Sequence, residues 1–132
     1  MESPDKIRDN NAGFVGLVER KSMKKILITG ALGMIGRELA NILKQDAENS
    51  IIITDLKIDQ DLRDFKTCLN LCEGIEEVYH LAGIKGSPKM TQERPSDFFV
   101  PMVQFNTNIM EAARIRRVKR FLYTSSIAVL NP

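Results

Sequence analysis

Three glycines at a regular spacing follow a short apolar run near the start of the chain. Gly30, Gly33 and Gly36 come directly after Ile26–Ile28, which predicts a strand covered on both faces. Gly30 allows a sharp turn out of the strand, Gly33 has no Cβ to keep a pyrophosphate away, and Gly36 lets a helix lie close to the strand. This pattern between a strand and a helix is typical of a dinucleotide phosphate site.

The helix after the glycines and a later aspartate support the same chemistry. Met34, Ile35 and Gly36 open the helix, where free N–H groups and the helix dipole favour a bound anion. A second apolar run, Ile51–Thr54, ends in Asp55, roughly 20 residues past the glycines, where the dinucleotide fold bonds the adenosine ribose. The alternative is that the glycines only form a turn against which a helix packs and that Asp55 is merely solvated. This alternative requires the glycine spacing and the aspartate position to coincide by chance. We predict NAD as the cofactor, and not NADP, because Asp55 repels a 2′-phosphate.

Composition limits the other function classes. The 132 residues carry a net charge of +2 with acids and bases mixed, so no nucleic-acid surface is expected, and the basic residues at 114–120 fit a helix C-terminus. No run predicts a membrane span, and we expect a soluble, cytoplasmic protein. Cys68 and Cys72 lack metal-ligand company and are expected to be half-buried thiols, and no metal site is predicted.

Hydrophobic patterning predicts an α/β chain. A helix from Met34 to about Gln45 is expected to bury Ile35, Leu39, Ile42 and Leu43. Further strands are expected at Ile51–Thr54, from Glu77, and at Val118–Ser126, with helices at 65–72 and 103–115 and a loop at 86–101. Leu56–Gln60 is too short for another strand. Right-handed crossovers would place the first strand between the second and third, with helices on both faces.

The motif T-G-x-x-G-x-x-G from Thr29 resembles the extended short-chain dehydrogenase/reductase superfamily, in its NAD-dependent epimerase/dehydratase branch acting on nucleotide sugars. The resemblance runs from Lys25 to about Asn131. It implies a Rossmann-like α/β fold in residues 23–132, a parallel sheet truncated after the fourth or fifth strand. Residues 1–22 are a polar appendage that we expect NAD binding not to need.

Two further segments carry the resemblance toward the cofactor. Asp61–Asp64 matches an acidic pair, which implies that the Asp61 carboxylate and the Leu62 backbone meet the adenine edge. Alternatively Asp61 or Asp64 is a helix N-cap. The segment after Glu77 resembles the H-L-A-A/G signature; the residues it places at the cofactor ribose and phosphate are Leu81, Ala82 and Gly83, with Lys85 near the nicotinamide-side ribose or else a loop charge. His80 is expected to bond backbone rather than to act in catalysis.

Two matches toward the carboxyl end are incomplete. Residues 108–113 match the end of the family pattern N-V-x-G-T-x-N-L-L-E-A-A, but Met102 stands where the family has its first asparagine, and Asn106 is one turn away. The resemblance implies that Ser126 contacts substrate and either polarises the reacting bond or relays a proton. The alternative is a serine that caps backbone groups. The family's base, the tyrosine of Y-x-x-x-K, has no match in these residues, because Tyr79 and Tyr123 fall inside predicted strands.

The predicted function is the NAD-binding N-terminal part of a nucleotide-sugar epimerase or dehydratase, inactive alone because Y-x-x-x-K is missing. The alternative is a non-catalytic NAD-binding sensor, or a subunit that another chain completes. The expected partners are a nucleotide sugar in the complete enzyme and a second copy of this chain, as a homodimer or looser self-association through the exposed last strand.

Overall fold

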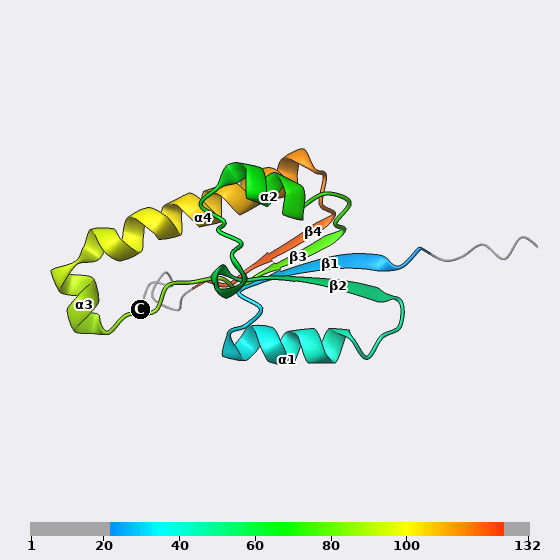
Figure 1. Ribbon diagram of the computed structural model, residues 1–132, viewed down its shortest axis with the longest axis horizontal. Coiled ribbons are helices and arrows are strands. Elements are labelled where there is room, and N and C mark those ends of the chain that lie inside the picture. Colours follow the sequence, from blue (N-terminus) through cyan, green and yellow to red (C-terminus); the bar gives the residue numbers. More distant parts are fainter. Residues whose placement is uncertain (1–21, 126–132) are drawn as a thin grey trace, which may run out of the picture.

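The computed structural model describes residues 22–125, which form a parallel sheet with helices on both faces (Figure 1). In chain order the elements are β1 (Lys24–Thr29), α1 (Met34–Leu43), β2 (Asn49–Thr54), the 3₁₀ helix η1 (Leu56–Ile58), α2 (Phe65–Leu71), β3 (Glu77–His80), α3 (Pro88–Glu93), α4 (Pro95–Ile115) and β4 (Arg120–Tyr123). Helix α1 covers one face, and α2 and α4 cover the other. The predicted Rossmann-like class is therefore confirmed. Ser126 lies outside the described residues, as does all of the N-terminal appendage except Ser22.

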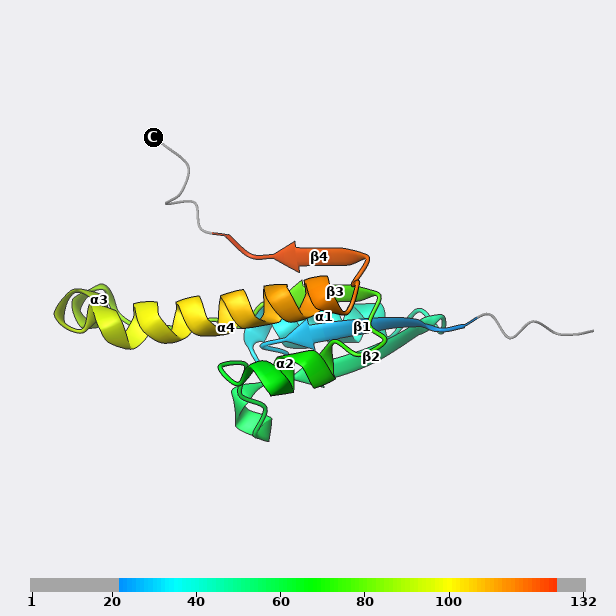
Figure 2. The ribbon, with the colours of Figure 1, turned by 90° about the horizontal axis from the view of Figure 1, so that it is seen from above.

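The strand order is β2-β1-β3-β4, which confirms that the first strand lies inside the sheet. Ile26 of β1 pairs with Ile51 of β2 on one side and with Glu77 of β3 on the other, and all three pairings in the sheet are parallel. Figure 2 shows β4 along one margin and β2 along the other. Because the strands are parallel, their carboxyl ends and the loops that follow meet at one edge.

Strand β1 divides its side chains between two apolar layers. Leu27 packs toward α2 and α4, whereas Ile26 and Ile28 pack toward α1, and all three are fully buried. Burial on both faces explains why this run shows no polar alternation. One prediction for α1 is wrong: Ile35 and Ile42 are 63% and 61% exposed, and the helix instead packs through three other residues, Leu39, Ala40 and Leu43.

Most of the stretch at 86–101 is helical rather than a loop, which corrects the sequence prediction. Helix α3 begins at Pro88 and α4 begins at Pro95, eight residues before the predicted start at Val103. Both prolines occupy the first turn, where a missing N–H costs nothing and the fixed φ suits a helix. The negative charge of Asp97, in the first turn of α4, interacts favourably with the positive end of the helix dipole. Pro101 lies inside the helix. The amino-terminal part of α4 consequently extends beyond the sheet (Figure 2).

Four of the five basic residues at 114–120 form ion pairs with glutamates, which is more specific than the predicted helix-end effect. The ion pairs are Arg114–Glu111, Arg116–Glu73, Lys119–Glu76 and Arg120–Glu77. Cys68 and Cys72 are fully buried rather than half-buried, and burial raises the pKa of their thiols to about 12 and about 11. No helix within residues 22–125 is long and apolar enough to cross a membrane.

Candidate functional site

The glycine turn after β1 packs too tightly for side chains at two of its three glycines. Gly30 has φ +65°, and a Cβ there would lie 2.8 Å from the N and Cα atoms of Ala82. A Cβ on Gly36 would overlap the Gly30 carbonyl oxygen and lie 2.7 Å from Ala31 Cα, so Gly36 lets α1 approach the turn itself rather than the strand. Gly30 therefore brings the loops after β1 and β3 into direct contact.

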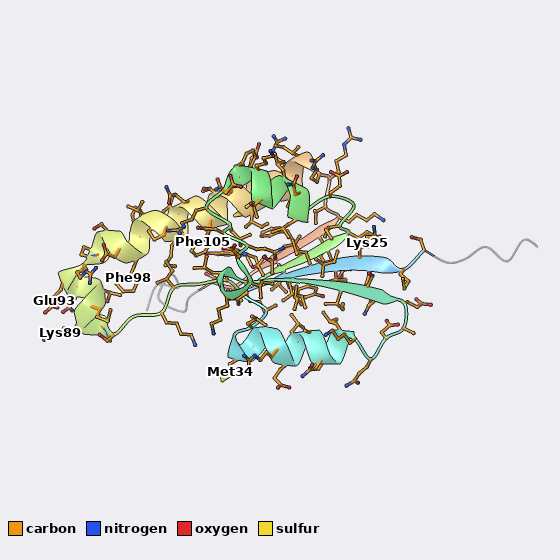
Figure 3. All side chains as sticks on the ribbon, in the orientation of Figure 1. Lys25, Met34, Lys89, Glu93, Phe98 and Phe105 are labelled. Carbon is orange, nitrogen blue, oxygen red and sulfur yellow. The ribbon has the colours of Figure 1, made fainter. Side chains whose placement is uncertain are left out.

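Gly33 differs from these two because it is exposed. It is the N-cap of α1, with φ −73° and ψ 171°, and no side chain caps the helix. Within the described part of the chain, a Cβ there would meet only the Gly30 carbonyl oxygen, at 3.1 Å. Met34 and Ile35 are exposed beside it, and Figure 3 shows Met34 at the start of α1. The amino end of the helix is thus open to an anion.

Asp55 joins the end of β2 to the glycine turn. Its Oδ2 accepts from the Leu32 N–H at 3.1 Å and its Oδ1 accepts from the Lys57 N–H at 3.0 Å, which caps η1. Residues 56–60 were predicted to be too short for another strand, and the 3₁₀ helix η1 occupies this place. Each carboxylate oxygen keeps a second acceptor position, so Asp55 is held rigidly and still able to accept from ribose hydroxyls.

The segment after η1 supplies a second fixed carboxylate. Arg63 donates to Asp61 from Nε at 2.9 Å and from Nη2 at 2.6 Å, and this hydrogen bonding lowers the pKa of the Asp61 carboxyl. Asp64, not Asp61, is the N-cap of α2: it accepts from the Lys66 and Thr67 amides. Hydrogen bonds to Thr67 lower the pKa of the Asp64 carboxyl. Asp61 is thereby left at the site as an ionised acceptor.

These segments surround a pocket of about 290 Å³ at the carboxyl edge of the sheet. Its lining residues are Gly30, Thr54, Asp55, Leu56, Gln60, Asp61, Leu62, Arg63, Ala82, Gly83, Ile84, Asp97, Pro101 and Phe105. Six residues predicted from the sequence are therefore brought together: Gly30, Asp55, Asp61, Leu62, Ala82 and Gly83. The volume is near the lower end of the roughly 300–1,000 Å³ range for small-molecule sites, which suits one end of an extended ligand.

Other predicted residues lie outside that lining. Gly33, Met34, Ile35 and Gly36 belong to the adjoining turn and helix start, Leu81 packs on the α1 side of the sheet, and Lys85 is exposed. The wall that sequence reasoning missed comes from α4, through Asp97, Pro101 and Phe105, because that stretch was predicted as a loop. Figure 3 shows Phe105 between α4 and the sheet, and Phe98 farther out along α4.

His80 was expected to bond backbone, and it bonds side chains instead. Its Nδ1 lies 2.6 Å from Thr29 Oγ1 and its Nε2 lies 2.7 Å from Asn106 Oδ1. Asn106 is therefore a hydrogen-bond partner of His80. It lies one helical turn from Met102, which stands where the family has its first asparagine. The histidine is fully buried, and desolvation lowers its pKa.

A model described as the NAD dependent epimerase/dehydratase family matches residues 26–132. The chain belongs to this family. GDP-mannose 3,5-epimerase of Arabidopsis thaliana is 33% identical over 118 residues, which cover 80% of this chain and 31% of that protein. Among solved structures, DdhaC superposes with a TM-score of 0.72 at 25% identity over 83% of this chain and 32% of its own.

A UDP-N-acetylglucosamine 4-epimerase from Bacillus cereus gives a TM-score of 0.68 at 25% identity, over 82% of this chain and 42% of that one. The chain spans about a third of the length of the curated relatives that it matches. Membership of the epimerase/dehydratase family therefore rests on the part of the fold that contains the glycine turn and the pocket.

The pocket of this family member has features that fit a dinucleotide. Thr54 Oγ1 and Gln60 Oε1 are buried at its wall without a hydrogen-bond partner among residues 22–125, so this region has unused hydrogen-bonding capacity. Asp55 supplies a carboxylate, Leu62 supplies backbone, and the Gly33 end of α1 is open. A carboxylate, backbone groups and an open helix end therefore lie along the carboxyl edge of the sheet.

Proposed function

We propose that this chain holds the adenosine and pyrophosphate end of NAD in a nucleotide-sugar epimerase or dehydratase. The observation that carries the proposal is the Asp55 carboxylate, which is tied to the glycine turn through the Leu32 amide and borders the pocket. Bound there, NAD supplies reversible hydride transfer at a sugar carbon. The relatives named as nucleotide-sugar epimerases support this substrate class.

The residues of this chain act by binding and orienting. Asp55 would accept hydrogen bonds from the adenosine ribose, while Asp61 and the Leu62 backbone would face the adenine. The amides of Met34, Ile35 and Gly36 would surround the pyrophosphate at the positive end of α1. Ala82 and Gly83 would let the β3 loop approach the cofactor, with Lys85 reaching its nicotinamide-side ribose. Ser126 is proposed to contact the sugar.

A protein of these 132 residues is expected to bind NAD without turning over a nucleotide sugar. The family's tyrosine base stands in Y-x-x-x-K, and this sequence contains no such motif. Proton transfer by a positioned side chain contributes on the order of 10²–10⁴-fold to a rate. A coupled assay for nucleotide-sugar oxidation would check this, and a measurable rate would show that another residue serves as the base.

The test of the proposed function is a calorimetric titration with NAD and with NADP. Tighter binding of NAD is expected, because the Asp55 carboxylate accepts from a ribose 2′-hydroxyl and repels a 2′-phosphate. In Asp55→Ala the gap between the two cofactors should narrow. Lys66→Ala is a suitable control because Lys66 is an exposed residue outside the pocket lining. Absence of NAD binding, or tighter binding of NADP to the unaltered chain, would contradict the proposal.

A further inference from the structure

A line of side-chain hydrogen bonds crosses the carboxyl edge of the sheet and reaches both α4 and β4. It begins at Thr29 of β1, passes through His80 of β3 to Asn106 of α4, and continues from Asn106 Nδ2 to the Tyr123 hydroxyl at 3.2 Å. Thr29 and His80 are fully buried, and the Tyr123 ring stacks on the imidazole at 5.7 Å. Four elements distant in sequence are thus connected.

The direction of each hydrogen bond follows from the chemistry of the groups. Asn106 Oδ1 only accepts, so His80 Nε2 carries a hydrogen, and in a neutral imidazole Nδ1 is then an acceptor. Thr29 Oγ1 accepts from the Ala82 N–H at 3.3 Å and has one hydrogen of its own, which it donates to His80 Nδ1. The order is Ala82 to Thr29 to His80 to Asn106, with every donor matched.

This line contacts two different walls of the pocket, at Ala82 through Thr29 and next to Phe105 through Asn106. Ala82 belongs to the β3 loop, which lines the pocket and touches Gly30 closely. Asn106 follows Phe105, which lines the pocket from α4 and whose ring meets the His80 ring edge-on at 6.0 Å. The line therefore connects a wall made by a loop to a wall made by a helix.

We infer that Asn106 is a positioning residue that, through His80 and Thr29, holds the Ala82 wall and the α4 wall of the pocket at a fixed separation. The contacts themselves do not depend on the ligand, although the consequence for NAD rests on the proposed function. Asn106→Leu leaves the buried His80 Nε2–H without an acceptor. Loss of a buried partner of this kind corresponds to at least about a fivefold change in an equilibrium constant.

Asn106→Asp separates positioning from simple packing. A carboxylate there accepts from His80 Nε2–H and from the Tyr123 hydroxyl, which keeps the line intact but raises the pKa of His80. The imidazole is surrounded by residues of three elements: Thr29 of β1, Phe105 and Asn106 of α4, and Phe121 and Tyr123 of β4. Tyr123 is the one titratable group among them. Protonated Nδ1 would become a donor, and the Thr29 hydroxyl hydrogen would lose its acceptor.

Three measurements on the full chain test the inference. Nitrogen-15 NMR of the imidazole reports the tautomer without ambiguity, because His80 is the sole histidine in the sequence. Hydrogen exchange gives the protection factor of the Ala82 amide without any ligand. NAD titration gives the affinity. The variants are Asn106→Leu and Asn106→Asp, with Gln104→Ala as the matched control on the exposed side of α4.

We expect an Nε2–H tautomer in the unaltered chain. Asn106→Leu should lower Ala82 protection and NAD affinity at least about fivefold, while Gln104→Ala changes neither. Asn106→Asp should resemble the unaltered chain near pH 8 and lose protection toward pH 6, as His80 becomes charged. An Nδ1–H tautomer, or unchanged Ala82 protection in Asn106→Leu, overturns the inference. Absence of NAD binding in the unaltered chain would contradict the proposed function. The role of Asn106 would then be decided by the hydrogen exchange of the Ala82 amide, which needs no ligand.

Discussion

Replacing Gly33 by valine should remove NAD binding and leave the fold intact. Gly33 is exposed, and among residues 22–125 a Cβ at this position meets only the Gly30 carbonyl oxygen, at 3.1 Å. The two methyl groups of valine would occupy the space in front of the α1 amino end, where the pyrophosphate must approach. Because Gly33 is an N-cap with φ −73°, no left-handed strain arises, and the loss of unfolding free energy should be about 1 kcal/mol.

The expected loss of affinity is much larger than the loss of stability. Hydrogen bonds to a charged group contribute about 1.5–3 kcal/mol each, so losing two of them weakens binding by about 10²- to 10⁴-fold. Calorimetry with NAD measures the affinity and thermal unfolding measures the stability. Asn41→Val is the matched control, because it places valine on an exposed position of the same helix. If Gly33→Val binds NAD like the unaltered chain, the cofactor does not lie over this turn.

Two further predictions concern physical behaviour. Burial lowers the pKa of His80, so below about pH 6.5 the unfolded chain binds more protons than the folded chain, and the free energy of unfolding should fall as the pH drops. Urea unfolding measured across this pH range checks the prediction. A free energy of unfolding that stays constant down to about pH 5 would contradict a buried neutral histidine. Strand β4 has an outer edge unpaired within residues 22–125, and Leu122 and Tyr123 are 44% and 45% exposed, so the chain should self-associate. Sedimentation over a concentration series tests this, and a monomer at all concentrations would argue against it.

The sheet and most of the pocket could be predicted because local signals and topology agree there. Glycine spacing marks the turn, apolar runs mark the strands, and parallel pairing brings Asp55, Asp61 and Ala82 to one edge. The two exposed isoleucines of α1 show the limit of periodicity. Ile35 and Ile42 share the helical spacing, but the face that meets the sheet is set by Gly36, whose missing Cβ lets α1 approach the turn.

The α4 wall and the His80 contacts could not be found from sequence spacing. Pro88 and Pro95 were interpreted as loop residues, whereas both begin helices, and that choice hid Asp97 and Phe105 from the predicted site. His80 and Asn106 are 26 residues apart and belong to a strand and a helix. Only the packing of α4 across the sheet brings their side chains together, and no local pattern encodes that distance.

The most direct test of NAD binding at this edge is an amide NMR map of the chain with and without NAD. We expect the largest shift changes at Ile35, Gly36, Leu62 and Ala82, in the glycine turn and around the pocket. The amides at the opposite end of the sheet, such as Glu76 and Lys119, should stay where they are. Shifts confined to that opposite end, or none at saturating NAD, would contradict a cofactor site at the carboxyl edge.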